Sequence, residues 1–461
     1  MFEKKIYKER RSILKRKVGK GVIFLPGNSE SPMNYPDNTF HFRQDSSFLY
    51  YFGIDKPGFY GIIDIDEGKD YIFGYDFTID DIIWMGPQPS VAELAEKVAV
   101  ENTGSTDDLK KIVDGILSQK RKIHFLPPYR GETSVKISEL LGISVNKIKD
   151  YSSLELIKAM AWQRSYKSDE EIEQIEKALK ISWEIYDSLM RKIEPGRYEY
   201  EMVAEINRII TQNGSNVSFP IILSVHGETL HNHSHNNKMN EGDLLIIDSG
   251  AESPEHYASD ITRTLPVSGK FTPVQKDIYE IVLKANETSI EFSQPGRKYK
   301  DIHLLSAQVI ASGLKDIGIM KGNVEDAVNE GAHALFFPHG LGHMMGMDVH
   351  DMENIGENYV GYTDTIKRSK QFGLAYLRLA KELEPGYVFT VEPGIYFIPA
   401  LIDQWKQADK YTDFINYDLL EKYRDFGGIR IEDDVLIKEK GHKVLGKPIP
   451  KSVKDIENKM S

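Results

Sequence analysis

The sequence contains no cysteine, which limits the chemistry available to the protein. Disulfides, thiolate zinc sites, iron–sulfur clusters and a cysteine nucleophile are excluded, so any metal must be held by oxygen atoms and imidazole nitrogens. The chain also lacks a run of about 18 apolar residues that would span a membrane. Met1 to Lys20 is rich in Lys, Arg and Glu and has no apolar core of the kind a secretory signal needs, so we expect cytoplasmic localisation.

An excess of positive charge is also missing. The chain has 58 Lys and Arg against 70 Asp and Glu, a formal net charge of −12. Net negative charge disfavours broad electrostatic binding to nucleic acid or to an anionic membrane. We therefore expect small molecules or peptides as partners, with no nucleic acid and no membrane.

The length of 461 residues exceeds what one hydrophobic core usually organises and indicates two domains. Short strand-like runs alternate with helical segments between residues 21 and 148, which predicts an α/β domain. The clearest runs are 22–25, 60–65 and 122–126, with a helix predicted at 91–101. Ser168 and Glu171 form a capping-box pattern that opens a long helix. The boundary is expected between residues 150 and 168, giving domains at 1–160 and 161–461.

The second region contains two internal repeats. Glu194-Pro195-Gly196-Arg197 recurs as Gln294-Pro295-Gly296-Arg297, each time before a segment with apolar residues at helical spacing. Residues 242–250 and 386–394 share a glycine, an apolar strand, an acid (Asp248 or Glu392) and a second glycine. An acid at the end of a buried strand is costly unless it is paired or binds a metal. The repeats favour two similar halves with inward carboxylates; the alternative is chance similarity of two short strands.

Five segments place acids or histidines in apolar or glycine-rich surroundings, where structural residues are more often neutral. They are Ile247-Asp248-Ser249-Gly250, Ala258-Ser259-Asp260-Ile261-Thr262-Arg263-Thr264, His339-Gly340-Leu341-Gly342-His343, Thr390-Val391-Glu392-Pro393-Gly394 and Gly428-Ile429-Arg430-Ile431-Glu432-Asp433-Asp434. A carboxylate-rich set with one imidazole suits Mn²⁺, Co²⁺ or Zn²⁺. Four carboxylates are enough to bridge two cations about 3.5 to 4 Å apart.

With these segments the sequence resembles the Xaa-Pro peptidases of the pita-bread metallopeptidase family over nearly its whole length. Near the amino terminus, residues 42–48 and 52–61 are similar to a segment that prolidases and aminopeptidases P share. The resemblance implies an α/β amino-terminal domain followed by an α+β pita-bread (creatinase/aminopeptidase) catalytic domain, with a curved antiparallel sheet and flanking helices. It also implies a homodimer or a higher oligomer.

The family pattern implies a role for each matching residue. The metal ligands would be Asp248, Asp260, His343, Glu392 and Glu432, holding two divalent cations, Mn²⁺ first and Co²⁺ or Zn²⁺ as alternatives. The catalytic groups would be His231, His350 and Glu392, with Glu392 carrying a proton to the leaving proline nitrogen. His339, Tyr396 and Arg430 would bind substrate around the proline ring. This chain has Asn232 where prolidases usually have tyrosine, so the resemblance does not decide the details of the loop that contains His231.

Some of these side chains have a structural alternative. Arg430 could serve only to neutralise Glu432 in an ion pair. For four further histidines of the second region, a surface or hydrogen-bonded structural role is favoured. These are His233, His235, His256 and His333.

The two family branches differ in whether the peptide continues beyond proline. The segment between His350 and Glu392 includes Arg378, which resembles the prolidase arginine that binds the free carboxylate of a dipeptide. A guanidinium suits bidentate carboxylate binding, so Arg378 favours Xaa-Pro dipeptidase activity. The alternative is that Arg378 is an arginine on a helix surface. The protein would then be an Xaa-Pro aminopeptidase that acts on longer peptides. A non-catalytic pita-bread binding module and a creatinase-like hydrolase are more remote alternatives, because the metal set is complete.

Overall fold

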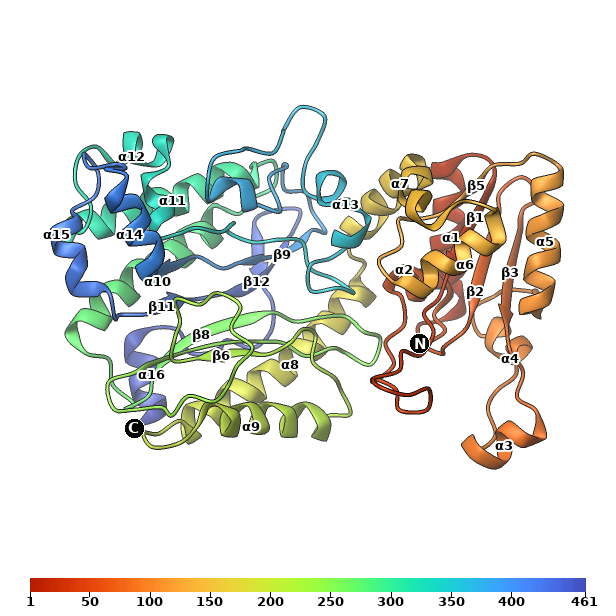
Figure 1. The fold of residues 1–461 in the computed structure, drawn as a ribbon, viewed down its shortest axis with the longest axis horizontal. Helices are drawn as coiled ribbons and strands as arrows, with labels where there is room; N and C mark the ends of the chain where they lie inside the picture. The colour runs from red at the N-terminus through yellow and green to blue at the C-terminus, as the bar shows by residue number, and fades with distance from the viewer. The chain divides into compact units, whose positions relative to one another are not determined.

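The computed structural model describes residues 1–461 and divides into two compact units (Figure 1). Unit 1 comprises Met1–Arg164 and Met352–Tyr359, and unit 2 comprises Ser165–Asp351 and Val360–Ser461. The predicted fold class, an α/β domain followed by an α+β pita-bread domain, is confirmed. The domain boundary expected between residues 150 and 168, with domains at 1–160 and 161–461, stays a prediction. No helix combines the length and the apolar character needed to cross a bilayer.

Unit 1 is built on a five-stranded sheet with the order β4-β3-β2-β1-β5. Apolar side chains of the sheet, including Phe24 and Phe73, bury against Leu109 and Val113 of α5 and Ile137 of α6. The strands are β1 (Val22–Pro26), β2 (Tyr60–Asp64), β3 (Lys69–Gly74), β4 (Asn102–Ser105) and β5 (Ile123–His124). The helices are α1 (Lys4–Val18), α2 (Ser46–Phe52), α3 (Ile79–Met85), α4 (Val91–Glu96), α5 (Thr106–Ser118), α6 (Gly131–Leu141), η1 (Val145–Tyr151), α7 (Leu154–Ser165) and α13 (Glu353–Val360).

Two predicted elements of unit 1 are shorter than expected. The helix predicted at 91–101 ends at Glu96, because Ala99 has a positive φ of 56° that a helix does not tolerate, and the chain then enters β4. The strand predicted at 122–126 pairs only over Ile123–His124. Pro127 and Pro128 follow it, and proline cannot donate to a strand ladder.

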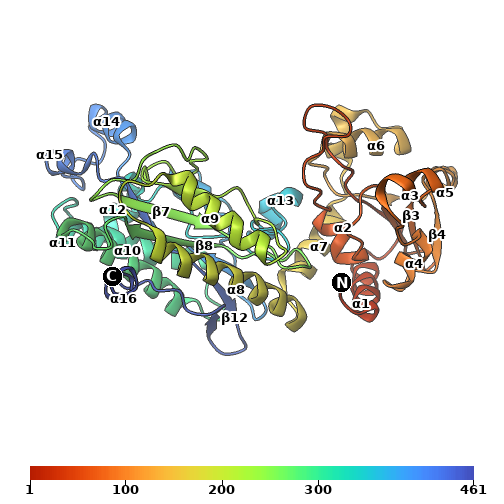
Figure 2. The ribbon, with the colours of Figure 1, turned by 90° about the horizontal axis from the view of Figure 1, so that it is seen from below.

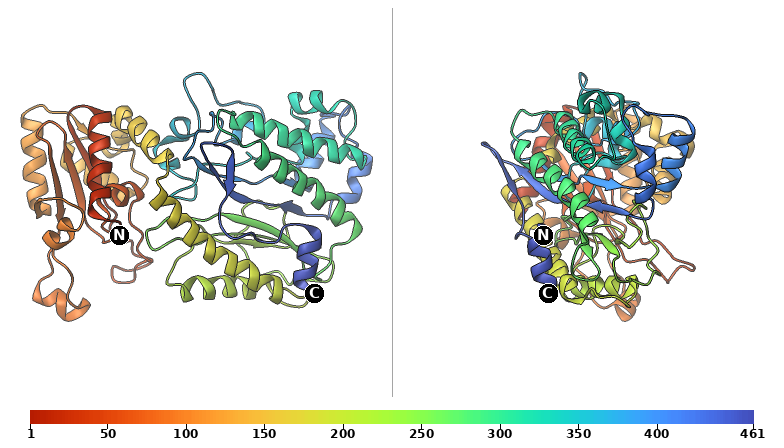
Figure 3. Two further views of the ribbon diagram at one scale, coloured as in Figure 1. Left: turned by 180° about the vertical axis from the view of Figure 1, so that it is seen from behind. Right: turned by 90° about the vertical axis from the view of Figure 1, so that its left-hand side faces the viewer.

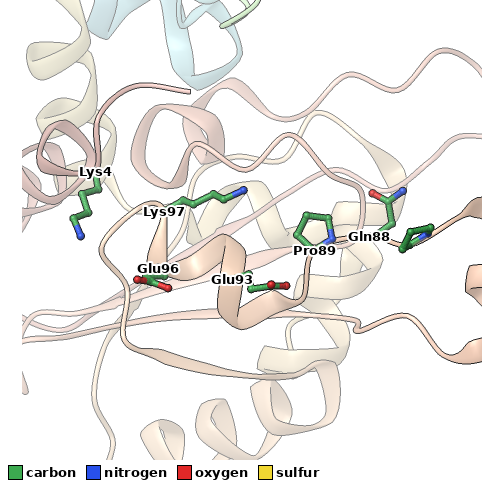
Figure 4. Close-up of a pocket in the computed structure, with 7 residues that line it drawn as sticks. Lys4, Gln88, Pro89, Glu93, Glu96 and Lys97 are labelled. Atoms are coloured by element: carbon green, nitrogen blue, oxygen red, sulfur yellow. The ribbon is translucent and has the colours of Figure 1, made fainter.

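Two surface features of unit 1 carry none of the predicted site residues. A shallow hollow is lined by Lys4, Lys97, Glu93 and Glu96, whose opposite charges offset one another, together with Pro87, Gln88 and Pro89 (Figure 4). Helix α3 has no buried residue, although it includes the large apolar side chains of Ile79, Ile83, Trp84 and Met85.

Unit 2 places two helix pairs against antiparallel strands. In Figure 2, α8 and α9 cross in front of β7 and β8, and the Tyr186 hydroxyl of α8 donates to Ile247 O of β7 at 3.1 Å. Seen from behind, α10 and α11 run beside each other over the remaining strands (Figure 3). The strands form three sheets with the orders β6-β7-β8, β13-β12-β9 and β10-β11.

The elements of unit 2 follow the chain in two successive halves. The strands are β6 (Ile222–Ser224), β7 (Leu244–Ser249), β8 (Ile261–Pro266), β9 (Val388–Val391), β10 (Gly394–Tyr396), β11 (Gly428–Arg430), β12 (Asp433–Ile437) and β13 (His442–Val444). The helices are α8 (Asp169–Lys192), α9 (Glu199–Gln212), α10 (Pro273–Phe292), α11 (Tyr299–Asp316), α12 (Val324–Glu330), η2 (Ala332–Leu335), η3 (Leu374–Tyr376), α14 (Pro399–Gln407), α15 (Tyr417–Leu420), η4 (Glu421–Tyr423) and α16 (Val453–Met460). The capping box of Ser168 and Glu171 opens α8 as predicted.

The internal repeats are confirmed in the hydrogen bonds of unit 2. Gly196 and Gly296 both have positive φ, and their N–H groups donate to Met239 O and Leu383 O, each at 2.8 Å. In return, Met239 N donates to Arg197 O and Leu383 N to Arg297 O, again each at 2.8 Å. The offset from Met239 to Leu383 is 144 residues, the same as from Asp248 to Glu392. Chance similarity of two strands does not explain a shared turn, so the two halves repeat one framework.

Asn286 of α10 gives a test of how this framework is held together. Its buried side-chain amide donates to Val391 O at 3.0 Å and to Ile431 O at 3.3 Å, the residues that precede Glu392 and Glu432. Asn286→Ala leaves both acceptors without this donor, at about 1 kcal/mol or more each, and should lower the calorimetric midpoint of unit 2 by roughly 4–8 °C. Asn240→Ala, at an exposed turn, is the control. Equal midpoints for the two variants would contradict the prediction.

Candidate metal centre

Five residues from both halves of unit 2 meet in one buried cluster. Asp248 ends β7, Asp260 precedes β8, His343 lies in the loop after η2, Glu392 follows β9, and Glu432 lies between β11 and β12. One potential ligand atom from each of Asp260, His343 and Glu432 lies within 4.8 Å of the other two. His343 Nε2 is 3.4 Å from Asp260 Oδ2 and 3.6 Å from Glu392 Oε1. The structure thus brings together the residues that the sequence predicts as ligands.

The hydrogen bonds of His343 leave its inner nitrogen available to a metal. Nδ1 lies 3.1 Å from Met344 O, so a proton on Nδ1 is donated to that carbonyl. Nε2, which faces the carboxylates, then carries the lone pair. Burial, and next the charge of His350, hold the pKa of His343 well below its ordinary value, so the ring is neutral. A neutral imidazole with a fixed Nδ1 proton is the form that binds metals.

The carboxyl groups raise one another's pKa. Burial, followed by the charges of Glu432 and Asp248, holds the pKa of Asp260 well above its ordinary value, and burial with Glu392 and Asp248 does the same for Glu432. For Glu392, burial raises the pKa to about 7, against the lowering effect of Arg430. Like charges this close in a poorly solvated site cannot all ionise unless cations compensate them.

The donors present fit divalent cations. The set has four carboxylates and one imidazole, all hard or borderline ligands, and Oδ1 of Asp248 is buried without a hydrogen-bond partner. A cation bound between the two aspartates would satisfy that oxygen and relieve the repulsion of its neighbours.

Two side chains that the sequence analysis did not single out hold the ligands in place. The Thr262 hydroxyl donates to Glu432 Oε2 at 2.6 Å, and Asp434 Oδ2 accepts from the backbone N–H of Asp260 at 3.1 Å. Both lie within the motifs already recognised, at positions two residues from a ligand. Their positions close to the candidate ligands were therefore visible in the sequence. Their hydrogen bonds to segments distant in the chain were not.

Arg430 begins a chain of hydrogen bonds that ends at the predicted proline pocket. Its guanidinium donates to Asp248 Oδ2 at 2.6 Å, to the Tyr396 hydroxyl at 2.9 Å and to Thr262 Oγ1 at 3.2 Å. The ion pair therefore forms with Asp248; the alternative expected a pair with Glu432 alone. The Tyr396 hydroxyl in turn lies 2.9 Å from His339 Nε2.

His339 is held as a neutral ring by this chain. Nδ1 lies 2.8 Å from Gly340 O, so the Tyr396 O–H donates to Nε2, and both ring nitrogens are engaged. Burial, and next the charge of Arg430, lower the pKa of His339 to about 3. The ring of Phe337 meets it edge-on at 4.9 Å between centroids. His339 and Phe337 thus offer a neutral aromatic wall.

The two predicted catalytic histidines lie at different depths. The half-buried ring of His350 is 4.1 Å from that of His343 between centroids. His231 is exposed, yet the loss of solvent around it, and next the charge of Arg430, lower its pKa, with smaller effects from Asp248 and His350. The structure therefore places His231 at the rim of the cluster and His350 against it.

Arg378 lies close enough to the cluster for its charge to act on it. The residue is half-buried and follows η3, so it is not on a helix surface. Its positive charge contributes to lowering the pKa of both His343 and Glu392, after larger causes. The alternative of a helix-surface arginine is therefore wrong for this position.

The remaining histidines take no part in the cluster. His256 Nδ1 pairs with Glu252 Oε2 at 2.7 Å, and His235 Nδ1 lies 3.1 Å from Leu223 O. His333 is buried in η2, and His233 is exposed. Asn232 turns its side-chain amide to Ser224 Oγ at 2.9 Å.

Known proteins with similar sequences and structures are peptidases. The chain is 33% identical to human Xaa-Pro dipeptidase over 446 residues, covering 95% of this chain and 88% of that protein. It is also 33% identical to a probable Xaa-Pro aminopeptidase of Sordaria macrospora over 424 residues, covering 91% and 87%. The solved structure of Pseudomonas aeruginosa aminopeptidase PepP superposes with a TM-score of 0.81 at 27% identity, covering 100% of this chain and 98% of that one.

Two family profiles divide the sequence between them. That of the aminopeptidase P amino-terminal domain matches residues 7–124. That of metallopeptidase family M24 matches residues 173–439, which include all five residues of the cluster. With its acids and histidine gathered at one site, and with this match over more than half of its length, the chain belongs to metallopeptidase family M24.

Proposed function

We propose that this protein is a divalent-metal-dependent Xaa-Pro dipeptidase, which hydrolyses the bond before proline in dipeptides. The observation that carries the proposal is the half-buried Arg378, whose positive charge acts on His343 and Glu392 of the cluster. The cluster supplies hydrolysis, the neutral wall of His339 suits a proline ring, and Arg378 supplies a cation for a free carboxylate. Human Xaa-Pro dipeptidase, a relative by sequence, carries the same activity in its name.

Asp248, Asp260, His343, Glu392 and Glu432 would hold two cations. Divalent cations, when bound, polarise a peptide carbonyl and lower the pKa of water enough to supply a nucleophile at neutral pH. Glu392 faces the same space as His343 Nε2 and is 19% exposed, so it can pass a proton to the leaving proline nitrogen. His350, against the cluster, and His231, at its rim, would donate to the developing oxyanion and orient the substrate.

Three further properties belong to the proposal. We propose Mn²⁺ as the metal, with Co²⁺ or Zn²⁺ as alternatives, because the ligands are mainly carboxylates. A homodimer is supported by the exposed apolar side chains of α3, which a partner would cover; sedimentation of the purified protein measures this. Cytoplasmic localisation also stays a proposal.

The first prediction concerns the ligands. Asp260→Ala and Glu432→Ala should each remove about one cation and most of the turnover, because no other side chain would replace the lost carboxylate. Metal content by mass spectrometry and the rate on Gly-Pro measure both effects. Glu241→Ala, an exposed carboxylate in the same unit, is the matched control and should change neither. Full metal content and full rate in both ligand variants would refute the assignment.

The second prediction separates His350 and His231 from the ligands. Replacing either with alanine should keep two cations and lower the rate by about 10², the usual scale for removing one oxyanion donor. His233→Ala changes an exposed histidine two positions from His231 and should stay within about twofold of wild type. If metal is lost from a His350 or His231 variant, that residue is a ligand.

The third prediction concerns substrate length. Losing a charge-assisted bidentate contact costs about 1.5–3 kcal/mol, so Arg378→Ala should lower kcat/KM for Gly-Pro about ten- to a hundredfold. Gly-Pro-Gly should lose much less, because it presents a neutral amide at the same place. Lys370→Ala, an exposed cation of the same segment, is the control.

The ratio of the two substrates decides between the branches. A wild-type preference for Gly-Pro-Gly, or equal losses on both substrates in Arg378→Ala, would favour an Xaa-Pro aminopeptidase. That alternative has its own support in the fungal and bacterial aminopeptidases to which the chain is similar.

A further inference from the structure

Lys167 and Asp351 form an ion pair that the chemistry described above does not use. Lys167 Nζ lies 2.9 Å from Asp351 Oδ2, and each side chain is only 1% exposed. The two residues are 184 positions apart, and Lys167 precedes α8 whereas Asp351 directly follows His350. A fully buried ion pair is costly to desolvate and rarely contributes net stability, so its presence calls for another role.

Asp351 closes the loop that runs from His343 to His350. Its backbone N–H donates to Met344 O at 2.9 Å, and Met345 N donates to Val388 O of β9 at 3.0 Å. Oδ1 of Asp351 also lies 3.5 Å from the N–H of Asp348, at the limit of a hydrogen bond. Asp351 therefore holds the end of this loop by its backbone N–H, while its carboxylate is held by Lys167.

Gly346 shows how closely the loop packs on this pair. A Cβ atom at position 346 would lie 2.5 Å from Asp351 Oδ2 and 3.0 Å from Lys167 Cε, so only glycine fits there. Gly346 O accepts from the N–H of Ala258 at 2.8 Å, two residues before Asp260. The pair thus lies where the loop of His350 meets the segment that carries Asp260.

A second lysine, Lys381, lies near Lys167 and allows a comparison with the Lys167–Asp351 pair. Lys381 is half-buried, and the loss of solvent around it, followed by the charge of Lys167, lowers its pKa to about 8. Its Nζ lies 3.5 Å from Ser165 Oγ and 4.5 Å from the centre of the Tyr387 ring, whereas Asp351 is bonded by Lys167. Lys381 is therefore a second, half-buried lysine near the ion pair, and its substitution can be compared with that of Lys167.

We propose that the Lys167–Asp351 ion pair positions His350 over the reacting carbonyl, so that Lys167 is a positioning residue for catalysis. The inference rests on the role proposed above for His350. Lys167 acts on His350 through Asp351, the next residue in the chain. A shift of about 1 Å in a catalytic group is enough to cost roughly 10²-fold in rate. Substrate binding by Arg378 and by the His339 wall involves other segments, so the effect should fall on kcat and spare KM.

The test is a double-mutant cycle between Lys167 and His350 in the metal-loaded full chain. Lys167→Met should lower kcat on Gly-Pro about tenfold or more, with KM and metal content unchanged. In the His350→Ala background the same substitution should change kcat less than about twofold, because the residue that it positions is gone. Lys381→Met, which removes a half-buried lysine from the same neighbourhood, should leave kcat within about twofold of wild type in either background.

Lys167→Met leaves the buried Asp351 carboxylate without the Lys167 cation and could prevent folding, so a second variant accompanies it. Lys167→Met/Asp351→Leu replaces the pair with apolar side chains of similar size, a change that buried ion pairs often tolerate. It should melt no lower than wild type and still show the loss of kcat. Wild-type kcat in this folded variant, equal losses with and without His350, or loss of metal would each overturn the inference. If His350→Ala itself has no effect on kcat, the proposed function of His350 fails instead.

Discussion

The mutual repulsion of four carboxylates in a poorly solvated site is the constraint on which the rest of unit 2 depends. Asp260 and Glu432 both have strongly raised pKa values, because each is buried among the others. Such a cluster ionises only with compensating positive charge, which divalent cations supply when bound. Protons compete with the cations for the same oxygens, so metal occupancy and protonation are linked at this site. Arg430, bonded to Asp248, supplies one permanent positive charge at the edge.

The duplicated framework explains how the acids come to face one another. In each half, a Pro-Gly-Arg turn exchanges two backbone hydrogen bonds with one residue, Met239 in the first half and Leu383 in the second. In both halves that residue lies three positions before the glycine that leads into the strand, β7 or β9. These hydrogen bonds fix where β7 and β9 begin. They thereby fix the positions of Asp248, near the end of β7, and of Glu392, directly after β9. The exchange uses backbone groups, which makes the placement insensitive to most side-chain substitutions. The precision that metal ligands need is therefore built into the strand starts.

The sequence predicted the parts of the site that depend on residue type and local pattern. The five candidate ligands were recognised from the resemblance to the family. Acids at the ends of two apolar strands and the 144-residue offset between them were already visible in the motifs. The Lys167–Asp351 pair was not predicted, since nothing local marks either residue and 184 positions separate them. The end of α4 was also missed, because it depends on the left-handed backbone of Ala99, a residue that usually favours helices.

Catalysis and recognition draw on different parts of the repeat. The acids lie on the shared framework, whereas His231 and Arg378 lie in the segments just before Met239 and Leu383, which differ between the halves. A segment outside the repeated hydrogen bonds can change length and sequence without moving a ligand. The first half uses it for a histidine at the rim, and the second for a guanidinium. With the role proposed for Arg378, exchange of the segment between His350 and β9 would be enough to separate dipeptidase from aminopeptidase activity on one site.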